Sequence, residues 1–186
     1  MKRIFDLLLA IVILFPLVVP MLLITISVRL SSRGPALYWS DRIGKGNNNF
    51  KMPKFRTMLI YTPTLATHLI DNPHSYLSPI GGFLRLTSLD ELPQLFSIIK
   101  GDMSFVGPRP ALFNQDDLIA LRTQIGVNKL LPGITGWAQV NGRDELSIAG
   151  KVALDEEYMS NQSPWFDIKI LRMTFLKVIN RDGVVH

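Results

Sequence analysis

The chain contains no cysteine and only three histidines. Without cysteine it forms no disulfide, no iron–sulfur cluster and no thiolate zinc site. The histidines, His68, His74 and His186, do not follow the spacing of a histidine metal site. A G-x-S-x-G sequence is also missing, which argues against a serine hydrolase. The lack of cysteine is compatible with a reducing compartment.

Charge is missing from residues 7–28. An α-helix rises roughly 1.5 Å per residue, so a helix over this run reaches across a hydrocarbon core of about 30 Å. A cleaved signal peptide is disfavoured, because the apolar run is too long and no small-x-small cleavage site follows it. The run therefore predicts a membrane segment, and its simplest form is a single-pass anchor.

Two features of this run favour a re-entrant helix instead. Pro16 lies near its middle and Pro20 follows one turn later, and each proline removes a backbone hydrogen bond. Basic residues flank the run on both sides, with Lys2 before it and Arg29 after it. Positive flanks prefer the cytoplasm, so a helix that enters, bends and returns satisfies both ends. We expect a re-entrant helix over residues 1–30, with the single-pass anchor as the alternative.

A shortage of acidic residues gives the chain a net charge of +5, from 20 Lys and Arg against 15 Asp and Glu. Such a balance suits an anionic membrane surface, nucleic acid or phosphorylated substrates. Beside a hydrophobic segment, lipid headgroups and phosphate substrates are the better interpretation. No dense run of Lys and Arg occurs, so we expect no nucleic-acid partner.

The remaining residues, 31–186, are long enough for one domain. Apolar residues around the turn sequence Gly44-Lys45-Gly46-Asn47-Asn48-Asn49 predict a β-hairpin over residues 34–60, and the prolines of residues 61–80 indicate mainly loop. Apolar spacing predicts helices at residues 90–100, 116–125, 149–159 and 165–180. We therefore predict an α+β fold, mostly helical with a small hairpin.

The predicted helix at residues 165–180 combines apolar positions with the cations Lys169, Arg172 and Lys177. This basic amphipathic pattern is typical of a helix that lies on a membrane surface. A helix that packs one face on a protein core and leaves a basic face in water has the same pattern. Both interpretations stay open on the sequence alone.

Two adjacent carboxylates, Asp90 and Glu91, lie at the expected start of the helix at residues 90–100. Asp90 is a good N-cap, and Ser88 with Glu91 matches a capping box, so capping is the ordinary explanation. A helix N-terminus also binds anions and lowers the pKa of a nearby carboxylate. A carboxylate kept ionised there can attack phosphorus while its neighbour holds a divalent cation. Capping and catalysis both remain open.

Cations suited to phosphate groups occur around this pair in the sequence: Lys54, Arg56, Arg85 and Arg109. Pro108 and Pro110 bracket Arg109 and stiffen its backbone, and a fixed guanidinium suits bidentate phosphate binding. A single arginine is more often a solvated or structural ion-pair partner. A second glycine-rich stretch, residues 132–143, ends in the cation Arg143.

Four sequence segments, in this order, resemble the bacterial sugar transferase family: residues 54–58, 89–95, 100–110 and 132–143. The resemblance extends over nearly the whole chain, and its motifs are long and specific. It is closest to the small monotopic polyprenyl-phosphate phosphoglycosyl transferases of this family. The resemblance implies a re-entrant membrane helix, interfacial amphipathic helices and a compact catalytic domain at residues 31–186, on the cytoplasmic face of the bacterial inner membrane.

The resemblance also implies an activity, the transfer of a sugar 1-phosphate from a UDP-sugar to polyprenyl (undecaprenyl) phosphate with release of UMP. Membrane lipids are a further partner, and the product starts O-antigen, capsule or glycoprotein glycan synthesis. By similarity, Asp90 attacks the β-phosphate to form a covalent phosphosugar, and Glu91 coordinates Mg²⁺. Similarity places Lys54, Arg85 and Arg109 near phosphates or the carboxylates, and Arg143 near the nucleotide. We add Arg56, from the same motif as Lys54, as a phosphate-binding residue.

One departure from the family pattern concerns the membrane helix. Members often have Ser-Pro at the break, whereas this chain has Phe15-Pro16 and lacks the hydroxyl that helps to satisfy the freed carbonyl groups. Two rival functions also follow from the residues. One is a phosphohydrolase that uses water in place of the lipid acceptor. The other is a membrane-anchored binding module whose carboxylates only cap a helix.

Overall fold

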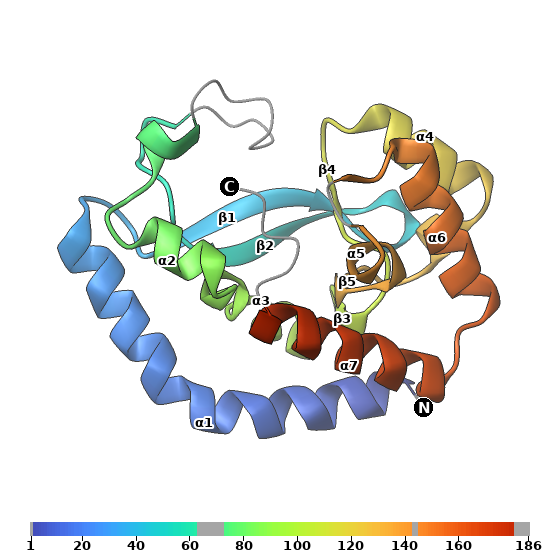
Figure 1. Ribbon diagram of the computed structural model, residues 1–186, viewed down its shortest axis with the longest axis horizontal. Coiled ribbons are helices and arrows are strands. Elements are labelled where there is room, and N and C mark those ends of the chain that lie inside the picture. The colour runs from blue at the N-terminus through green and yellow to red at the C-terminus, as the bar shows by residue number, and fades with distance from the viewer. Residues whose placement is uncertain (1, 63–72, 143–144, 181–186) are drawn as a thin grey trace.

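The computed structural model of the chain describes residues 2–62, 73–142 and 145–180. Helices make up most of it and two small sheets complete it, which confirms the predicted α+β class. One long helix, α1 (Lys2–Ser31), runs along one side of a body formed by the other elements (Figure 1). Parts of the loop expected at residues 61–80 lie outside the described residues.

The predicted hairpin is formed by β1 (Leu37–Ile43) and β2 (Asn49–Phe55), which pair antiparallel. The turn between them contains the 3-10 helix η1 (Lys45–Asn47), in which Gly46 has a φ of 68°. Glycine adopts this left-handed conformation without steric cost. The short strand β4 (Ala111–Leu112) pairs with the other edge of β1. β1 is therefore the central strand of this sheet, between β2 and β4.

The other elements form the rest of the body. In chain order they are η3 (Pro73–Tyr76), α2 (Gly81–Leu86), η4 (Leu89–Glu91), α3 (Gln94–Lys100), β3 (Ser104–Val106), α4 (Asp116–Gln124), η5 (Val127–Lys129), β5 (Gly133–Thr135), α5 (Trp137–Val140), α6 (Ile148–Ser160) and α7 (Pro164–Asn180). The predicted helices at residues 116–125, 149–159 and 165–180 are confirmed as α4, α6 and α7. β3 and β5 pair in parallel, and the largest apolar cluster joins α3, β3, α6 and α7.

The helix predicted at residues 90–100 begins later than expected. α3 starts at Gln94, and Asp90 lies in the preceding 3-10 turn. Backbone bonds before α3 are of the tighter i→i−3 kind, such as the 3.2 Å bond from Glu91 N to the carbonyl of Ser88. Pro93 has no N–H to continue this series, so the turn ends before the helix starts.

The helix α1 is continuous but bends about midway along its length (Figure 1). Pro16 and Pro20 lie inside it, and internal prolines are a usual cause of such a bend. By length and composition, α1 is the one helix in the described ranges that could cross a membrane. Its outer face exposes large apolar side chains: Ile4, Phe5, Leu8, Ile11, Val12, Phe15, Val18, Val19, Leu22, Leu23, Ile26 and Leu30.

Both ends of α1 are attached to the same body. At its start, the Lys2 ammonium pairs with the carboxylate of Asp167 on α7. Arg3 donates hydrogen bonds to the last carbonyls of α3, one of them at 2.8 Å. At the other end, Arg56 donates to the carbonyl of Ser32 at 2.9 Å. The helix therefore returns to the body from which it starts.

The helix α7 uses one face for packing and leaves the other exposed. Ile170 is fully buried in the apolar core, and Asp167 accepts a 2.7 Å hydrogen bond from Tyr158 on α6. On the outer face, Trp165 is 81% exposed and Phe175 is 65% exposed. One face of the helix thus packs on the core, while its exposed face carries large apolar side chains as well as cations. Both interpretations of this helix therefore stay open.

Candidate active site

The carboxylate pair lies in the turn η4, which contacts β2 and α2. The cap positions of η4 and α3 are Ser88 and Pro93, and neither makes a side-chain capping hydrogen bond. Glu91 bonds instead to cations from distant parts of the chain. The capping explanation therefore does not describe the contacts of this pair.

Two cations bind the same oxygen of Glu91. Lys54 Nζ on β2 lies 2.7 Å from Glu91 Oε1, and Arg109 Nη2 lies 3.0 Å from it. Burial by itself raises the pKa of Glu91, but the charges and hydrogen bonds of Lys54 and Arg109 outweigh burial and hold the pKa well below its usual range. Glu91 is therefore ionised at neutral pH, and its Oε2 atom is used by neither cation.

Asp90 has a different environment, although it is the adjacent residue. Its side chain is buried, and within residues 2–62, 73–142 and 145–180 it makes no hydrogen bond or ion pair. Burial raises the pKa of Asp90, and the positive charge of Lys54 offsets only part of the rise. A carboxylate with a raised pKa and unbonded oxygens is a strong nucleophile once it is ionised.

A third cation, Arg85 on α2, lies close enough to Asp90 for their charges to interact. Its Nε atom donates to Thr57 Oγ1 at 3.0 Å, which fixes the guanidinium. Burial lowers the pKa of both Arg85 and Lys54, and the carboxylates oppose this effect. Three cations thus face two carboxylates, and the excess positive charge suits a phosphate ligand.

A further cation near the site, Arg42 on β1, is partly buried and was not predicted as a site residue. Its Nη1 atom donates to the carbonyl of Pro110 at 3.1 Å. Burial and the nearby charge of Arg109 lower the pKa of Arg42 to about 10. Strand alternation could have found this residue, because Arg42 shares a strand face with Tyr38, the partner of Lys54 in the hairpin.

One predicted phosphate-binding residue, Arg56, has its hydrogen bonds away from the carboxylates. Arg56 Nη2 donates to the carbonyl and the hydroxyl of Ser32, at 2.9 Å each, and its Nη1 donates to the carbonyl of Arg33. Arg56 thus holds the chain after α1, and its phosphate-binding role stays a prediction. Arg143 lies outside the described residues.

The donor set at η4 fits Mg²⁺ better than a structural metal. Mg²⁺ in proteins uses one or two carboxylates and completes its coordination with substrate phosphates and water. Glu91 Oε2 and the carboxylate of Asp90 supply such oxygens. Across the described ranges, no group of three His, Cys, Asp or Glu forms a dedicated metal site. An ion here would therefore bind together with a phosphate group.

These features define a small domain with an attached apolar helix and a carboxylate pair inside a cluster of cations. The family model for the bacterial sugar transferase matches residues 1–181. The chain therefore belongs to the bacterial sugar transferase family, as its motifs indicated.

Similar proteins differ in how much of their length the chain covers. It is 40% identical to the uncharacterized sugar transferase EpsL of Bacillus subtilis, over 99% of this chain and 90% of that protein. It is 37% identical to the undecaprenyl-phosphate glucose phosphotransferase of Komagataeibacter xylinus, over 96% of this chain but 36% of that protein. Identity to the UDP-glucose:undecaprenyl-phosphate glucose-1-phosphate transferase of Escherichia coli is 38%, over 95% of this chain and 40% of that protein.

Proposed function

We propose that the protein transfers a sugar 1-phosphate from a UDP-sugar to polyprenyl phosphate, such as undecaprenyl phosphate, and releases UMP. The main support is the inequality of the two carboxylates. Glu91 is bound by Lys54 and Arg109, whereas Asp90 is buried beside it without a hydrogen bond from the described residues. A relative named for UDP-glucose and undecaprenyl phosphate indicates the same substrate classes.

The proposed reaction has two displacement steps. In the first, an oxygen of Asp90 bonds to the β-phosphorus of the UDP-sugar. The bond from this phosphorus to the bridging oxygen breaks, and UMP leaves with the electron pair. Asp90 then holds the sugar phosphate as an acyl phosphate. In the second step, a phosphate oxygen of the polyprenyl phosphate attacks the same phosphorus, and the Asp90 oxygen leaves as a carboxylate. The product is a polyprenyl diphosphosugar, which would start the synthesis of a glycan such as O-antigen or capsule.

The surrounding cations fit this chemistry. Lys54 and Arg109 hold Glu91 ionised in place, and together with Arg85 they offset the charge of the diphosphate. Glu91 would hold Mg²⁺ through Oε2, and the bound ion would neutralise negative charge on the diphosphate. Arg143 is proposed to lie near the nucleotide.

We further propose that the domain lies on the cytoplasmic face of the inner membrane and that α1 enters and leaves the bilayer from this face. Attachment of both ends of α1 to one body supports this topology, because a spanning helix would separate its ends by the thickness of the bilayer. Asp6, 1% exposed, adds a 2.8 Å bond from Ser104 Oγ to the attachment.

A panel of UDP-sugars, assayed for UMP release with and without undecaprenyl phosphate, tests the proposed function. We expect one or more UDP-sugars to give UMP and lipid-linked sugar in equal amounts. UMP with free sugar phosphate and no lipid product would identify the rival phosphohydrolase. No UMP from any UDP-sugar would favour the rival binding module.

A further inference from the structure

Residues 107–110, named the Arg109 segment below, lie between β3 and β4 and place Arg109 beside Glu91. Three consecutive carbonyl groups of this segment each accept a hydrogen bond from a different element. The donors are Gly133 N to Pro108 at 2.9 Å, Arg122 Nη1 to Arg109 at 2.8 Å, and Arg42 Nη1 to Pro110 at 3.1 Å. β5, α4 and β1 therefore all fix the backbone that presents the Arg109 side chain.

The backbone of the Arg109 segment is in close contact with the backbone around the start of β5. A Cβ added at Gly107 would lie 2.3 Å from the carbonyl oxygen of Leu131, and one at Gly133 would lie 2.2 Å from Gly107 N. Only glycine permits this approach. The Arg109 segment therefore cannot move toward β5, and the two arginine donors hold its next two carbonyl groups.

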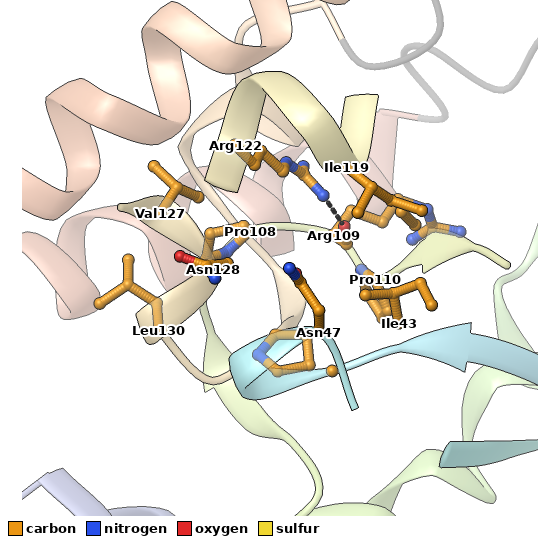
Figure 2. Close-up of a pocket in the computed structure, with 13 residues that line it drawn as sticks. Ile43, Asn47, Pro108, Arg109, Pro110, Ile119, Arg122, Val127, Asn128 and Leu130 are labelled. Carbon is orange, nitrogen blue, oxygen red and sulfur yellow. Dashed lines mark hydrogen bonds between the residues drawn. The ribbon is translucent and has the colours of Figure 1, made fainter. Parts of the chain in front are cut away.

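Arg122 is itself fixed by a buried ion pair with Asp155 on α6. Asp155 Oδ2 accepts from Arg122 Nη2 at 2.6 Å and from Nε at 2.9 Å. The two side chains are 10% and 1% exposed. Figure 2 shows the remaining guanidinium nitrogen of Arg122 directed at the oxygen of Arg109. Every nitrogen of this guanidinium thus has an assigned partner.

A buried ion pair contributes little net stability, because desolvation of the two charges offsets their attraction. This pair therefore needs another explanation. A planar guanidinium can bind a carboxylate on one edge and a carbonyl on the other, which transmits the position of Asp155 to the Arg109 backbone. An apolar pair of similar size would join α4 to α6 but could not hold that carbonyl.

We propose that Arg122, held by Asp155, is a positioning residue that sets the Arg109 guanidinium against Glu91 and the substrate phosphates. This inference rests on the proposed function. Arg42 assists through its hydrogen bond to the carbonyl of Pro110. A misplacement of about 1 Å can cost roughly a hundredfold in rate, so even a small shift of the Arg109 segment should reduce turnover.

The competing explanation is that the ion pair only joins α4 to α6. The two explanations differ in how a change at Arg122 combines with a change at Arg109. A positioning residue that acts through Arg109 loses its effect once the Arg109 side chain is removed. A purely structural residue lowers activity by the same factor with or without that side chain.

The test is a double-mutant cycle measured as kcat/KM for UMP release. Arg122→Gln with Asp155→Asn removes both charges together, so no buried charge is left unpaired. It is made in the wild type and in an Arg109→Ala background. The matched control is Lys129→Gln with Glu156→Gln. Lys129 follows α4 and Glu156 lies on α6, both side chains are exposed, and the two replacements remove one charge of each sign in the same way. Thermal unfolding is recorded for every variant.

In the wild type, we expect Arg122→Gln with Asp155→Asn to lower kcat/KM about tenfold or more. In the Arg109→Ala background, the same two substitutions should lower it less than about twofold. Equal losses in both backgrounds would overturn the proposal. If the double variant does not fold, Arg122→Lys is used in the same cycle. Lysine can still pair with Asp155, but it lacks the planar guanidinium needed to donate to the carbonyl of Arg109 at the same time.

Hydrogen exchange over residues 107–112 provides a readout that does not depend on turnover. Faster exchange here in the Arg122 and Asp155 variant, but not in the control, supports the positioning role, and unchanged exchange contradicts it. A wild type that releases no UMP from any UDP-sugar would count against the proposed function. The exchange data would then still decide the positioning role, so the two failures are distinguishable.

Discussion

The outer face of α1 exposes large apolar side chains, whereas the turn η4 buries charged ones. Phe15 on α1 is 85% exposed and Leu30 is 83% exposed. In η4, Asp90 is 8% exposed, and the Glu91 side chain is 15% exposed. Soluble proteins usually bury apolar side chains and expose charged ones, so both arrangements reverse the usual pattern, and both cost free energy in water.

The two regions differ in how the chain compensates these costs. At η4 the described cations Lys54, Arg85 and Arg109 compensate the carboxylates and leave an excess of positive charge. At the outer face of α1, nothing in the described parts of the chain covers the apolar side chains. The charges of η4 are thus compensated within the protein, whereas the apolar side chains of α1 suit contact with an apolar phase such as lipid. Such a difference is expected of an enzyme that joins a soluble phosphorylated substrate to a lipid.

The largest expected effect comes from Asp90→Asn. The amide keeps the size and capping ability of the side chain but is not a nucleophile. We expect UMP release to fall more than about a hundredfold, with Asp117→Asn on α4 as a control of near wild-type rate. A rate for Asp90→Asn above about a hundredth of wild type would sink the nucleophile assignment and leave η4 an ordinary ionic cluster.

The next effect concerns the apolar region. Replacing Pro16 and Pro20 with Leu should give an unbent helix of spanning length, move its amino-terminal end across the membrane and abolish most activity. A cysteine inserted between Met1 and Lys2 reports the topology and preserves the pairing of Lys2 with Asp167. A membrane-impermeant thiol reagent should label it from the periplasm only in the proline variant. Periplasmic labelling with both prolines present would show a plain single-pass anchor.

A smaller effect is expected for Glu91→Gln. An amide is a poorer ligand than a carboxylate for a hard cation, so the Mg²⁺ concentration for half-maximal activity should rise several-fold. Titrations of activity against Mg²⁺ measure this, with Glu156→Gln as the control. Superimposable curves for Glu91→Gln and wild type would exclude Glu91 as the metal ligand. Glu91 would then only bind Lys54 and Arg109.

The smallest effect should come from Arg56→Lys, which lies between the two regions. Lysine cannot serve both oxygens of Ser32 and the carbonyl of Arg33, so we expect Tm to fall by about 2–4 °C while KM for the UDP-sugar stays within about twofold. Thermal unfolding and steady-state kinetics check this. A raised KM with an unchanged Tm would instead support the predicted phosphate-binding role of Arg56.

The local elements could be predicted because their signals are local. The glycines and asparagines around Gly46 predicted the hairpin turn, and apolar spacing predicted α4, α6 and α7. The start of α3 was placed too early, because Ser88 in the left-handed region and the i→i−3 bonds before Pro93 leave no clear trace in the sequence.

The contacts of the site were harder to predict, because they join distant segments. Asp90 and Glu91 were predicted as site residues from adjacent positions in the sequence, but the binding of one Glu91 oxygen by both Lys54 and Arg109 depends on how β2 packs against η4. Arg56 was assigned because it belongs to the same motif as Lys54, and its bonds to Ser32 and Arg33 depend on how the chain after α1 packs.

The proposed reaction requires that Asp90 forms a covalent intermediate, and intact-protein mass spectrometry tests this step directly. The protein is incubated with an active UDP-sugar and Mg²⁺ without any lipid acceptor, next to an Asp90→Ala variant. We expect the wild type to gain the mass of the sugar phosphate, the variant to gain none, and undecaprenyl phosphate to remove the added mass. A wild type that turns over once the acceptor is supplied, but never gains mass without it, would contradict the claim.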